Sequence, residues 1–129
     1  MSLLLSGDDG ASKIYDTLIP AALNATGNAP MFVCRAWVNF NGAGTVAIRE
    51  SGNVSSITDN GTGLYTINFT VSMPDANYSL AGGGGRTGAG VSVSETSTSP
   101  VRSVSALKIG SYGAGSSIDY DYISVLIFR

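Results

Sequence analysis

The sequence predicts an all-β protein: an antiparallel β-sandwich of about eight strands, jelly-roll-like, with an extended N-terminal arm. Two observations predict this class. From about residue 31 onward, apolar and polar residues alternate with a period of two, as in strands that are buried on one face. Glycine, asparagine and aspartate interrupt the alternation at short intervals, which is typical of turns between short strands. A chain of 129 residues suits one such domain rather than two.

Eight segments carry the strand pattern, separated by turn-forming or glycine-rich residues. In chain order they cover residues 32–40, 45–50, 54–58, 64–71, 77–81, 91–94, 103–109 and 119–129. The clearest alternation follows residues 59–63, where an Asn-Gly pair tolerates the positive φ of a tight hairpin turn. The segments 82–90 and 110–117 are rich in glycine, and we expect both to be loops.

The last segment, residues 119–129, differs from the others because it is apolar on both faces. One face carries Ile123, Val125 and Ile127. The residues predicted for the opposite face are Tyr120, Tyr122, Leu126 and Phe128. A strand with two apolar faces lies in the centre of a sheet or against a second subunit. We therefore expect these four residues to form a subunit interface.

The first 28 residues lack the strand pattern. We expect residues 1–28 to form an arm for docking or assembly, and residues 29–129 to form the β-sandwich domain. Apolar residues recur at helical spacing in the arm, but Pro20 interrupts them, so at most a short helical turn is expected. The apolar anchors of the arm are Leu3, Leu4, Leu5, Tyr15, Leu18 and Ile19. The alternative interpretation is a disordered terminus.

The composition argues against catalysis. The chain has no histidine and one cysteine, which removes the commonest general base, the commonest metal ligand and any internal disulfide. We therefore expect no catalytic residue, no cofactor and no metal site. Charged residues are few and scattered and the net charge is −2, so nucleic acid is not an expected partner. No apolar run approaches the roughly 20 residues of a membrane span, so a membrane is not an expected partner either. A surface with so few charges predicts that copies of the chain, or another protein, cover much of it.

Several motifs that could carry chemistry have simpler structural interpretations. Residues 83–88 match the pattern G-x-G-x-x-G, but a strand follows instead of the helix that receives a pyrophosphate. Asp119 and Asp121 could help to hold calcium or to cleave a glycoside, but we expect solvated or edge-protecting charges. Cys34 alternates with inward residues and is expected to be a buried, inert thiol. Trp37 and the tyrosines are expected to pack in the core and between subunits, with a platform for sugar rings as the alternative.

Three stretches carry a resemblance to a known family: RAWVNFNG from Arg35, NVSSITDNGTGLYT from Asn53 and MPDANYS from Met73. Over residues 29–81 the chain resembles a module of tailed-bacteriophage virion proteins, often found at the C-terminus of tail-fibre-like chains of phages that infect cyanobacteria and other aquatic bacteria. The resemblance implies a non-enzymatic, β-rich, trimeric surface module, and it carries no catalytic residues to transfer. In tail fibres a long shaft precedes the module, whereas here about 28 residues precede it, without shaft-forming repeats.

The first functional hypothesis is therefore a bacteriophage virion structural protein. It would be a homotrimeric capsid decoration (cement) protein or head fibre, assembled in the host cytoplasm and docked by its arm on the major capsid protein or a tail component. The alternative is a short tail-fibre or receptor-binding module that attaches to host surface glycans. Under that alternative, Arg86 and Tyr112 in the two expected loops are the candidate receptor contacts.

Overall fold

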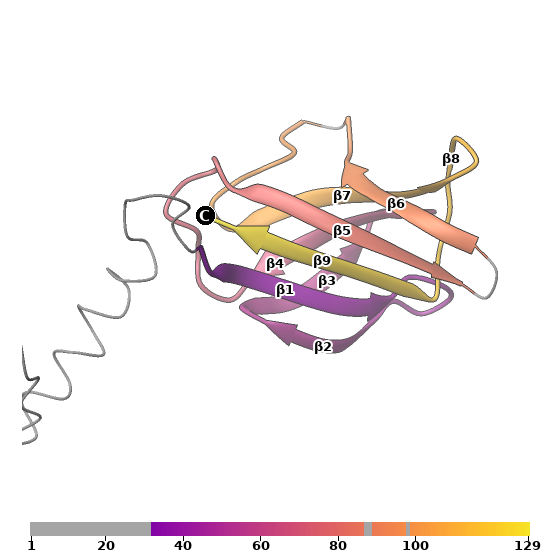
Figure 1. Cartoon of the computed structure of the whole chain (residues 1–129), viewed down its shortest axis with the longest axis horizontal. Coiled ribbons are helices and arrows are strands. Elements are labelled where there is room, and N and C mark those ends of the chain that lie inside the picture. The colour runs from indigo at the N-terminus through magenta and orange to yellow at the C-terminus, as the bar shows by residue number, and fades with distance from the viewer. Residues whose placement is uncertain (1–31, 87–88, 98) are drawn as a thin grey trace, which may run out of the picture. The chain divides into compact units, whose positions relative to one another are not determined.

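A computed structural model describes residues 32–86, 89–97 and 99–129 (Figure 1). The chain divides after Val33, and Cys34–Arg129 forms one compact unit, which is the subject of this section. The expectations for the arm, including its six apolar anchors, fall on residues outside the described ranges.

The described part of the chain is all-β, and every pair of neighbouring strands is antiparallel, which confirms the predicted fold class. The strands are β1 Cys34–Asn41, β2 Ala47–Gly52, β3 Val54–Asp59, β4 Leu64–Phe69, β5 Ser79–Arg86, β6 Ala89–Glu95, β7 Ala106–Gly113, β8 Ser116–Ser117 and β9 Tyr122–Phe128.

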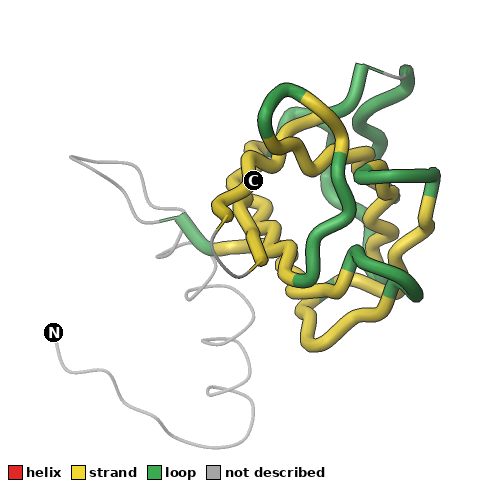
Figure 2. The backbone as a smooth tube through the Cα atoms, turned by 90° about the vertical axis from the view of Figure 1, so that its right-hand side faces the viewer, coloured by secondary structure: helices red, strands yellow, loops and turns green. Residues whose placement is uncertain are grey.

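One continuous sheet contains all of these strands, in the order β2-β1-β9-β5-β6-β7-β4-β3, with β8 paired to β7. The sheet curls on itself, and Figure 2 shows the strands arranged around a common centre. The arrangement is thus closer to a barrel than to the two separate layers of a sandwich. The sheet curls because its two edge strands, β2 and β3, are consecutive in the chain, with only Asn53 between them. The connection holds both edges of the sheet together.

Asn53 fixes this junction through both its backbone and its side chain. Its φ is 56°, in the left-handed region that asparagine tolerates better than most residues. The amide Nδ2 donates to the carbonyls of Arg35 and Val71, at 3.2 and 3.1 Å, and Oδ1 accepts from the Val71 amide at 2.7 Å. One side chain therefore connects β1 to the segment after β4.

Replacement of Asn53 by alanine is expected to lower the free energy of unfolding by about 1–3 kcal/mol, because it removes these hydrogen bonds and leaves a residue with a Cβ at positive φ. Asn53→Gly keeps the backbone conformation without the hydrogen bonds, so it separates the two contributions. Urea denaturation of both variants measures them. Equal stability of Asn53→Ala and the natural chain would contradict this role.

The core is formed by alternate residues of the strands, with the best alternation on β4 as predicted. Tyr65 and Ile67 of β4 are 1% and 0% exposed. Tyr65 packs edge-on against Phe40 of β1, with ring centroids 5.1 Å apart, and Phe69 packs in the same way against Tyr78 at 5.8 Å. Edge-to-face pairs of this kind add to the stabilisation by apolar burial.

The two segments expected to be loops are hairpins instead. Residues 82–90 belong mostly to β5 and β6, and residues 110–117 to β7 and β8. Two glycines of β5 allow close backbone approach to β9: a Cβ would lie 2.1 Å from the Tyr122 carbonyl oxygen at Gly84, and 3.0 Å from that of Ser124 at Gly82. The turn between β7 and β8 uses positive φ at Ala114 and Gly115. Sequence alone could not distinguish these roles of glycine.

Asp119 is a structural acceptor, which corrects the expectation of a solvated or edge-protecting charge. Its Oδ1 accepts a hydrogen bond from the Gly63 amide at 2.6 Å and lies 2.9 Å from the Tyr65 hydroxyl. That hydroxyl also lies 3.1 Å from the Gly42 carbonyl oxygen. The carboxylate thus ties the β3–β4 turn to the segment before β9. Asp121 is exposed and does not share this cluster.

The pKa of Tyr65 is raised above its usual value of about 10, first by burial and then by the hydrogen bond to Asp119. The folded state therefore holds the phenolic proton more tightly than the unfolded state. The resulting stability is complete below about pH 10 and is lost as the pH rises above it. Burial raises the pKa of Tyr78 in the same direction.

Tyr65→Phe is expected to lower the free energy of unfolding by about 1–2 kcal/mol at neutral pH, because Asp119 loses a donor. The variant should also lose less stability between neutral pH and pH 11 than the natural chain does, since one of the two shifted tyrosines is gone. Thermal denaturation over this pH range measures both effects. Parallel alkaline profiles for the two proteins would contradict the assigned role of the hydroxyl.

Candidate functional site

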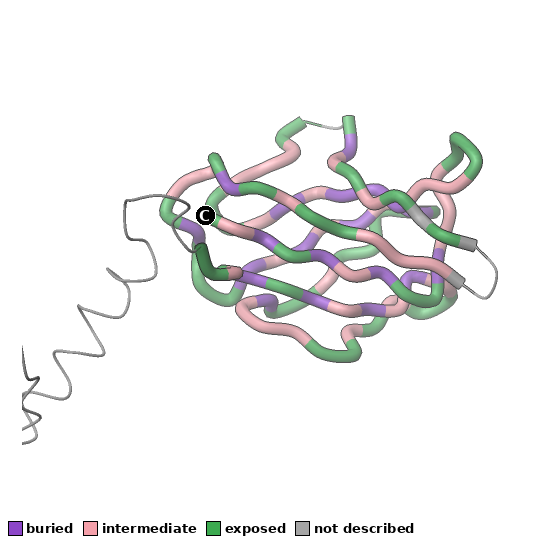
Figure 3. Tube along the Cα trace, in the orientation of Figure 1, coloured by how far each residue is buried: buried purple, intermediate pink, exposed green. Residues whose placement is uncertain are grey.

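The final strand is central in the sheet and apolar on both faces, as predicted. β9 lies between β1 and β5 (Figure 1). Ile123, Val125 and Ile127 point into the core and are at most 1% exposed. The alternate residues Tyr122, Leu126 and Phe128 point outward, and Figure 3 shows the corresponding alternation of burial along the central strands.

These outward residues belong to a surface that spans three strands. It is apolar except at Ser124, between Tyr122 and Leu126, whose hydroxyl accepts a hydrogen bond from Asn39 of β1 at 2.8 Å. In the strand register, Leu126 lies directly opposite Trp37 of β1 on one side and Ala81 of β5 on the other. Directly opposed residues of antiparallel strands point to the same face. We call the surface made by Trp37, Ala81, Tyr122, Leu126 and Phe128 the outer strand face. Three of its large side chains are strongly exposed: Trp37 and Leu126 at 40% and Tyr122 at 57%.

A glycine, Gly52, and a cation, Arg49, shape the outer strand face. The indole of Trp37 lies over Gly52, because a Cβ at Gly52 would stand 2.5 Å from its Nε1 atom. The guanidinium of Arg49 lies over the Tyr122 ring, 4.2 Å from its centroid, in cation–π contact. The Trp37 ring therefore packs on the sheet at Gly52, and the Arg49 guanidinium covers one face of the Tyr122 ring.

Tyr120 does not belong to the outer strand face, which corrects the prediction for that residue. It is 3% exposed and lies in the core. Its carbonyl accepts a hydrogen bond from the Gly42 amide at 2.9 Å. The reason is that β9 begins only at Tyr122, so the alternation of the strand does not extend back to residue 120. Trp37, for which the sequence predicted the core or a subunit contact, alternates with the inward residues of β1 and lies on the outer strand face.

Arg86 and Tyr112, the candidate receptor contacts, lie on strands that are not neighbours. Arg86 ends β5, and its side chain is outside the description, whereas Tyr112 belongs to β7, with β6 between the two strands. The Tyr112 ring lies over Gly110, where a Cβ would stand 2.4–2.6 Å from the ring and its hydroxyl. The Tyr112 ring therefore lies on the sheet over Gly110, and one strand, β6, separates its strand from that of Arg86.

Cys34 is half-buried rather than fully buried. The register between β1 and β9 shifts between Cys34 and Ala36, so this bulge breaks the alternation that predicted an inward thiol. The Sγ atom lies 3.1 Å from the Ala36 carbonyl oxygen. Across residues 32–86, 89–97 and 99–129, no three cysteine or acidic side chains come close enough together to hold a metal ion.

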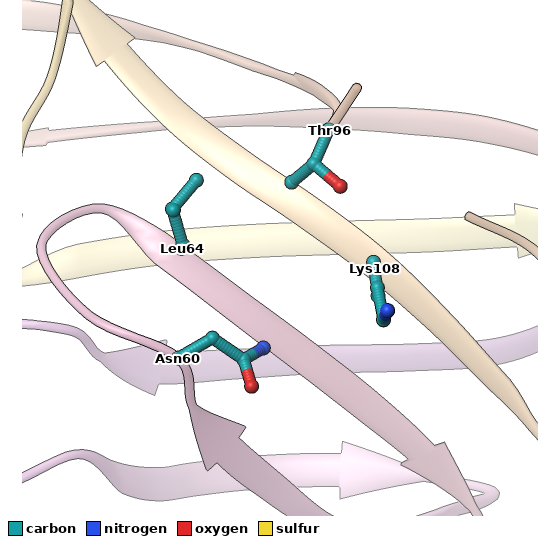
Figure 4. A pocket seen from close by; sticks show the side chains of 4 residues that line it. All are labelled: Asn60, Leu64, Thr96 and Lys108. Carbon is teal, nitrogen blue, oxygen red and sulfur yellow. The ribbon is translucent and has the colours of Figure 1, made fainter. Parts of the chain in front are cut away.

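A small pocket with a mixed polar and apolar lining lies over β4 and β7. It has a volume of about 190 Å³ and is lined by Asn60, Leu64, Thr96 and Lys108 (Figure 4). Leu64 and Lys108 come from the paired strands β4 and β7, Asn60 from the turn before β4, and Thr96 from the segment after β6. No sequence pattern predicts this pocket, because its residues are isolated polar or apolar positions in four segments.

No family model, curated protein or solved structure matches the chain. In the part of the chain that the structure describes, no helix has the length and hydrophobicity to cross a membrane.

Proposed function

We propose that this chain is a non-enzymatic structural protein of a bacteriophage virion, in which three copies associate through the outer strand face. That face is the observation that carries the proposal. Clusters of large exposed apolar side chains mark sites of protein interaction, and tryptophan and tyrosine are the residues most enriched at the centres of interfaces. The chain carries too few charges to keep such a face in solution without a partner.

The virion and the number of copies follow from the resemblance of residues 29–81 to a phage surface module. Within the particle, the chain is a capsid decoration protein or a head fibre, assembled in the host cytoplasm. The arm, residues 1–28, docks on the major capsid protein or on a tail component through its apolar anchors. A sheet with a polar and an apolar side suits this task, because assembly covers the apolar side and leaves the other exposed on the particle.

The alternative role, attachment to host glycans through Arg86 and Tyr112, has less support. The two residues belong to non-adjacent strands, and Tyr112 is already packed over Gly110. No observation joins the two residues in one binding surface.

Cryo-electron microscopy of the virion whose genome encodes this chain tests the proposal. We expect three-fold density that fits three copies of the barrel on the capsid, with the outer strand faces turned toward one another. Density at the tip of the tail would favour the receptor-binding alternative. Absence of the chain from purified particles would overturn the proposal.

A further inference from the structure

We propose that Asn60 is a site of covalent self-modification, at which the backbone nitrogen of Gly61 attacks the Asn60 side chain and converts it to aspartate or isoaspartate. The new carboxylate lies beside Lys108. This inference does not rest on the assembly role, because the reacting groups are neighbours in one chain and belong to the β3–β4 turn, outside the outer strand face.

The chemistry requires an asparagine followed by a residue with an unhindered backbone nitrogen. Hydroxide takes the Gly61 amide proton, a bond forms between the Gly61 nitrogen and Asn60 Cγ, and the bond from Cγ to Nδ2 breaks. The departing nitrogen takes a proton from water and leaves as ammonia, so a cyclic succinimide remains. Water then opens the ring at either carbonyl, which gives aspartate or isoaspartate. The net reaction consumes one water, releases one ammonia and replaces a neutral amide by a carboxyl group.

The structure leaves this pair of residues open to solvent. Asn60 and Gly61 follow β3 in the turn to β4, and both are exposed. A Cβ added at Gly61 would have no neighbouring atom within 4 Å, so nothing covers this end of the turn. The other end is fixed, since the Gly63 amide donates to Asp119 Oδ1 at 2.6 Å and the Gly63 carbonyl accepts from the Ser111 amide at 2.8 Å. Water and hydroxide therefore reach the reacting atoms.

The chain contains a second Asn-Gly pair, Asn41–Gly42, which the fold protects. Gly42 is buried, and its amide donates to the Tyr120 carbonyl at 2.9 Å. The side chain of Asn41 is also held, because its Nδ2 donates to the carbonyls of Ala43 and Thr45 at 2.7 and 3.2 Å. The same dipeptide thus occurs in an open and in a closed setting within one chain.

Two hydrogen bonds restrain the reacting groups and limit the rate of the first step. The Gly61 amide donates to Asp59 Oδ1 at 2.9 Å, and Asn60 Nδ2 donates to the Thr66 hydroxyl at 2.8 Å. Both bonds must open before the Gly61 nitrogen can attack. Both are exposed, so water can replace either partner, which is not possible at the buried Gly42 amide.

Lys108 provides a partner for the product. It lies directly opposite Thr66 in the register of β4 and β7, so the two side chains point to the same face. Asn60, which reaches the Thr66 hydroxyl, lines the same small pocket as Lys108 (Figure 4). Lys108 takes part in neither of the two ion pairs among the described residues. A carboxylate at position 60 can therefore accept a charge-assisted hydrogen bond from it.

Mass spectrometry of the full chain, after incubation in neutral buffer, tests the proposal. Cleavage after arginine separates the two Asn-Gly pairs, because Asn41 lies in residues 36–49 and Asn60 in residues 50–86. We expect Asn60 to convert at least about tenfold faster than Asn41, and several-fold faster again at one pH unit higher. Both aspartate and isoaspartate should form. Equal rates at the two asparagines would overturn the proposal, as would aspartate without isoaspartate, because direct hydrolysis bypasses the cyclic intermediate.

Two variants and a control assign the roles in this reaction. Asn60→Gln should remain unmodified over the same period, because the longer side chain would have to close a larger ring. Thr66→Val should speed conversion of Asn60 several-fold, because it removes the acceptor of Nδ2 and nearly keeps the side-chain shape. Thr70→Val, at an exposed position away from the turn, should leave the rate unchanged. A natural rate in Thr66→Val would contradict the restraint assigned to this hydroxyl.

The contact with Lys108 is tested in Asn60→Asp, which carries one of the two products. Lys108→Gln should lower the Tm more in this variant than in the natural chain, because only the variant has a carboxylate to lose its partner. An equal fall in both proteins would contradict the pairing.

Discussion

Gly84→Ala is expected to lower the free energy of unfolding by about 3 kcal/mol or more, at the upper end of what overpacking costs. The added Cβ would lie 2.1 Å from the Tyr122 carbonyl oxygen and 3.1 Å from the Ile123 Cα atom. These are backbone atoms of the central strand β9, so no side-chain rotation relieves the contact. β5 and β9 must separate where their pairing holds the barrel together. Urea denaturation at a fixed protein concentration measures the loss.

Gly90→Ala is the matched control in the neighbouring strand of the same hairpin. Nothing lies within 4 Å of its added Cβ, and its φ is not in the left-handed region. Alanine there restricts the unfolded chain, so the variant should be unchanged or more stable by up to about 1 kcal/mol. A Gly84→Ala protein as stable as Gly90→Ala would contradict the close approach of β5 to β9.

Leu126→Glu is expected to dissociate the assembly while the barrel stays folded. Leu126 stands at the centre of the outer strand face, between Trp37 and Ala81. Glutamate at a covered position would be an unpaired charge without water, which costs several kcal/mol. In the single chain the glutamate side chain points to solvent, so it should lower the free energy of unfolding only slightly. A cooperative thermal transition of the monomer would show that the barrel is still folded. Circular dichroism and light scattering measure the two effects.

Val104→Glu is the matched control for this change. Val104 is 44% exposed, close to the 40% of Leu126, but it lies in the segment before β7 and outside the outer strand face. We expect Val104→Glu to keep the oligomeric state of the natural chain. Dissociation of both variants to the same extent would indicate a general effect of charge rather than a specific interface.

The parts of the fold that the sequence predicted correctly are those set by local pattern. The period-two alternation identified β4 and the two apolar faces of β9, because strand periodicity is a property of neighbouring residues. Tyr120 was misassigned because the same alternation was extended beyond the first residue of the strand.

The features that were missed depend on residues far apart in the chain. The close approach that requires Gly84 involves Tyr122 on β9, and glycine-rich composition by itself predicts a flexible loop. Asp119 meets Gly63 and Tyr65 only in the folded barrel, at separations of 56 and 54 residues. Closure of the sheet depends on the order in which all its strands pair, and the sequence of any single strand does not indicate that order. The pocket over β4 and β7 was missed as well, because its four lining residues come from four separate segments.

Sedimentation equilibrium of the full natural chain tests most directly whether the outer strand face is an interface. The chain has a mass of 13.2 kDa, and over micromolar concentrations we expect a species of three times that mass. Leu126→Glu should sediment as the single chain, and Val104→Glu as the natural assembly. A natural chain that sediments at 13.2 kDa throughout this range, with Trp37, Tyr122 and Leu126 still exposed to solvent, would contradict assembly through this face.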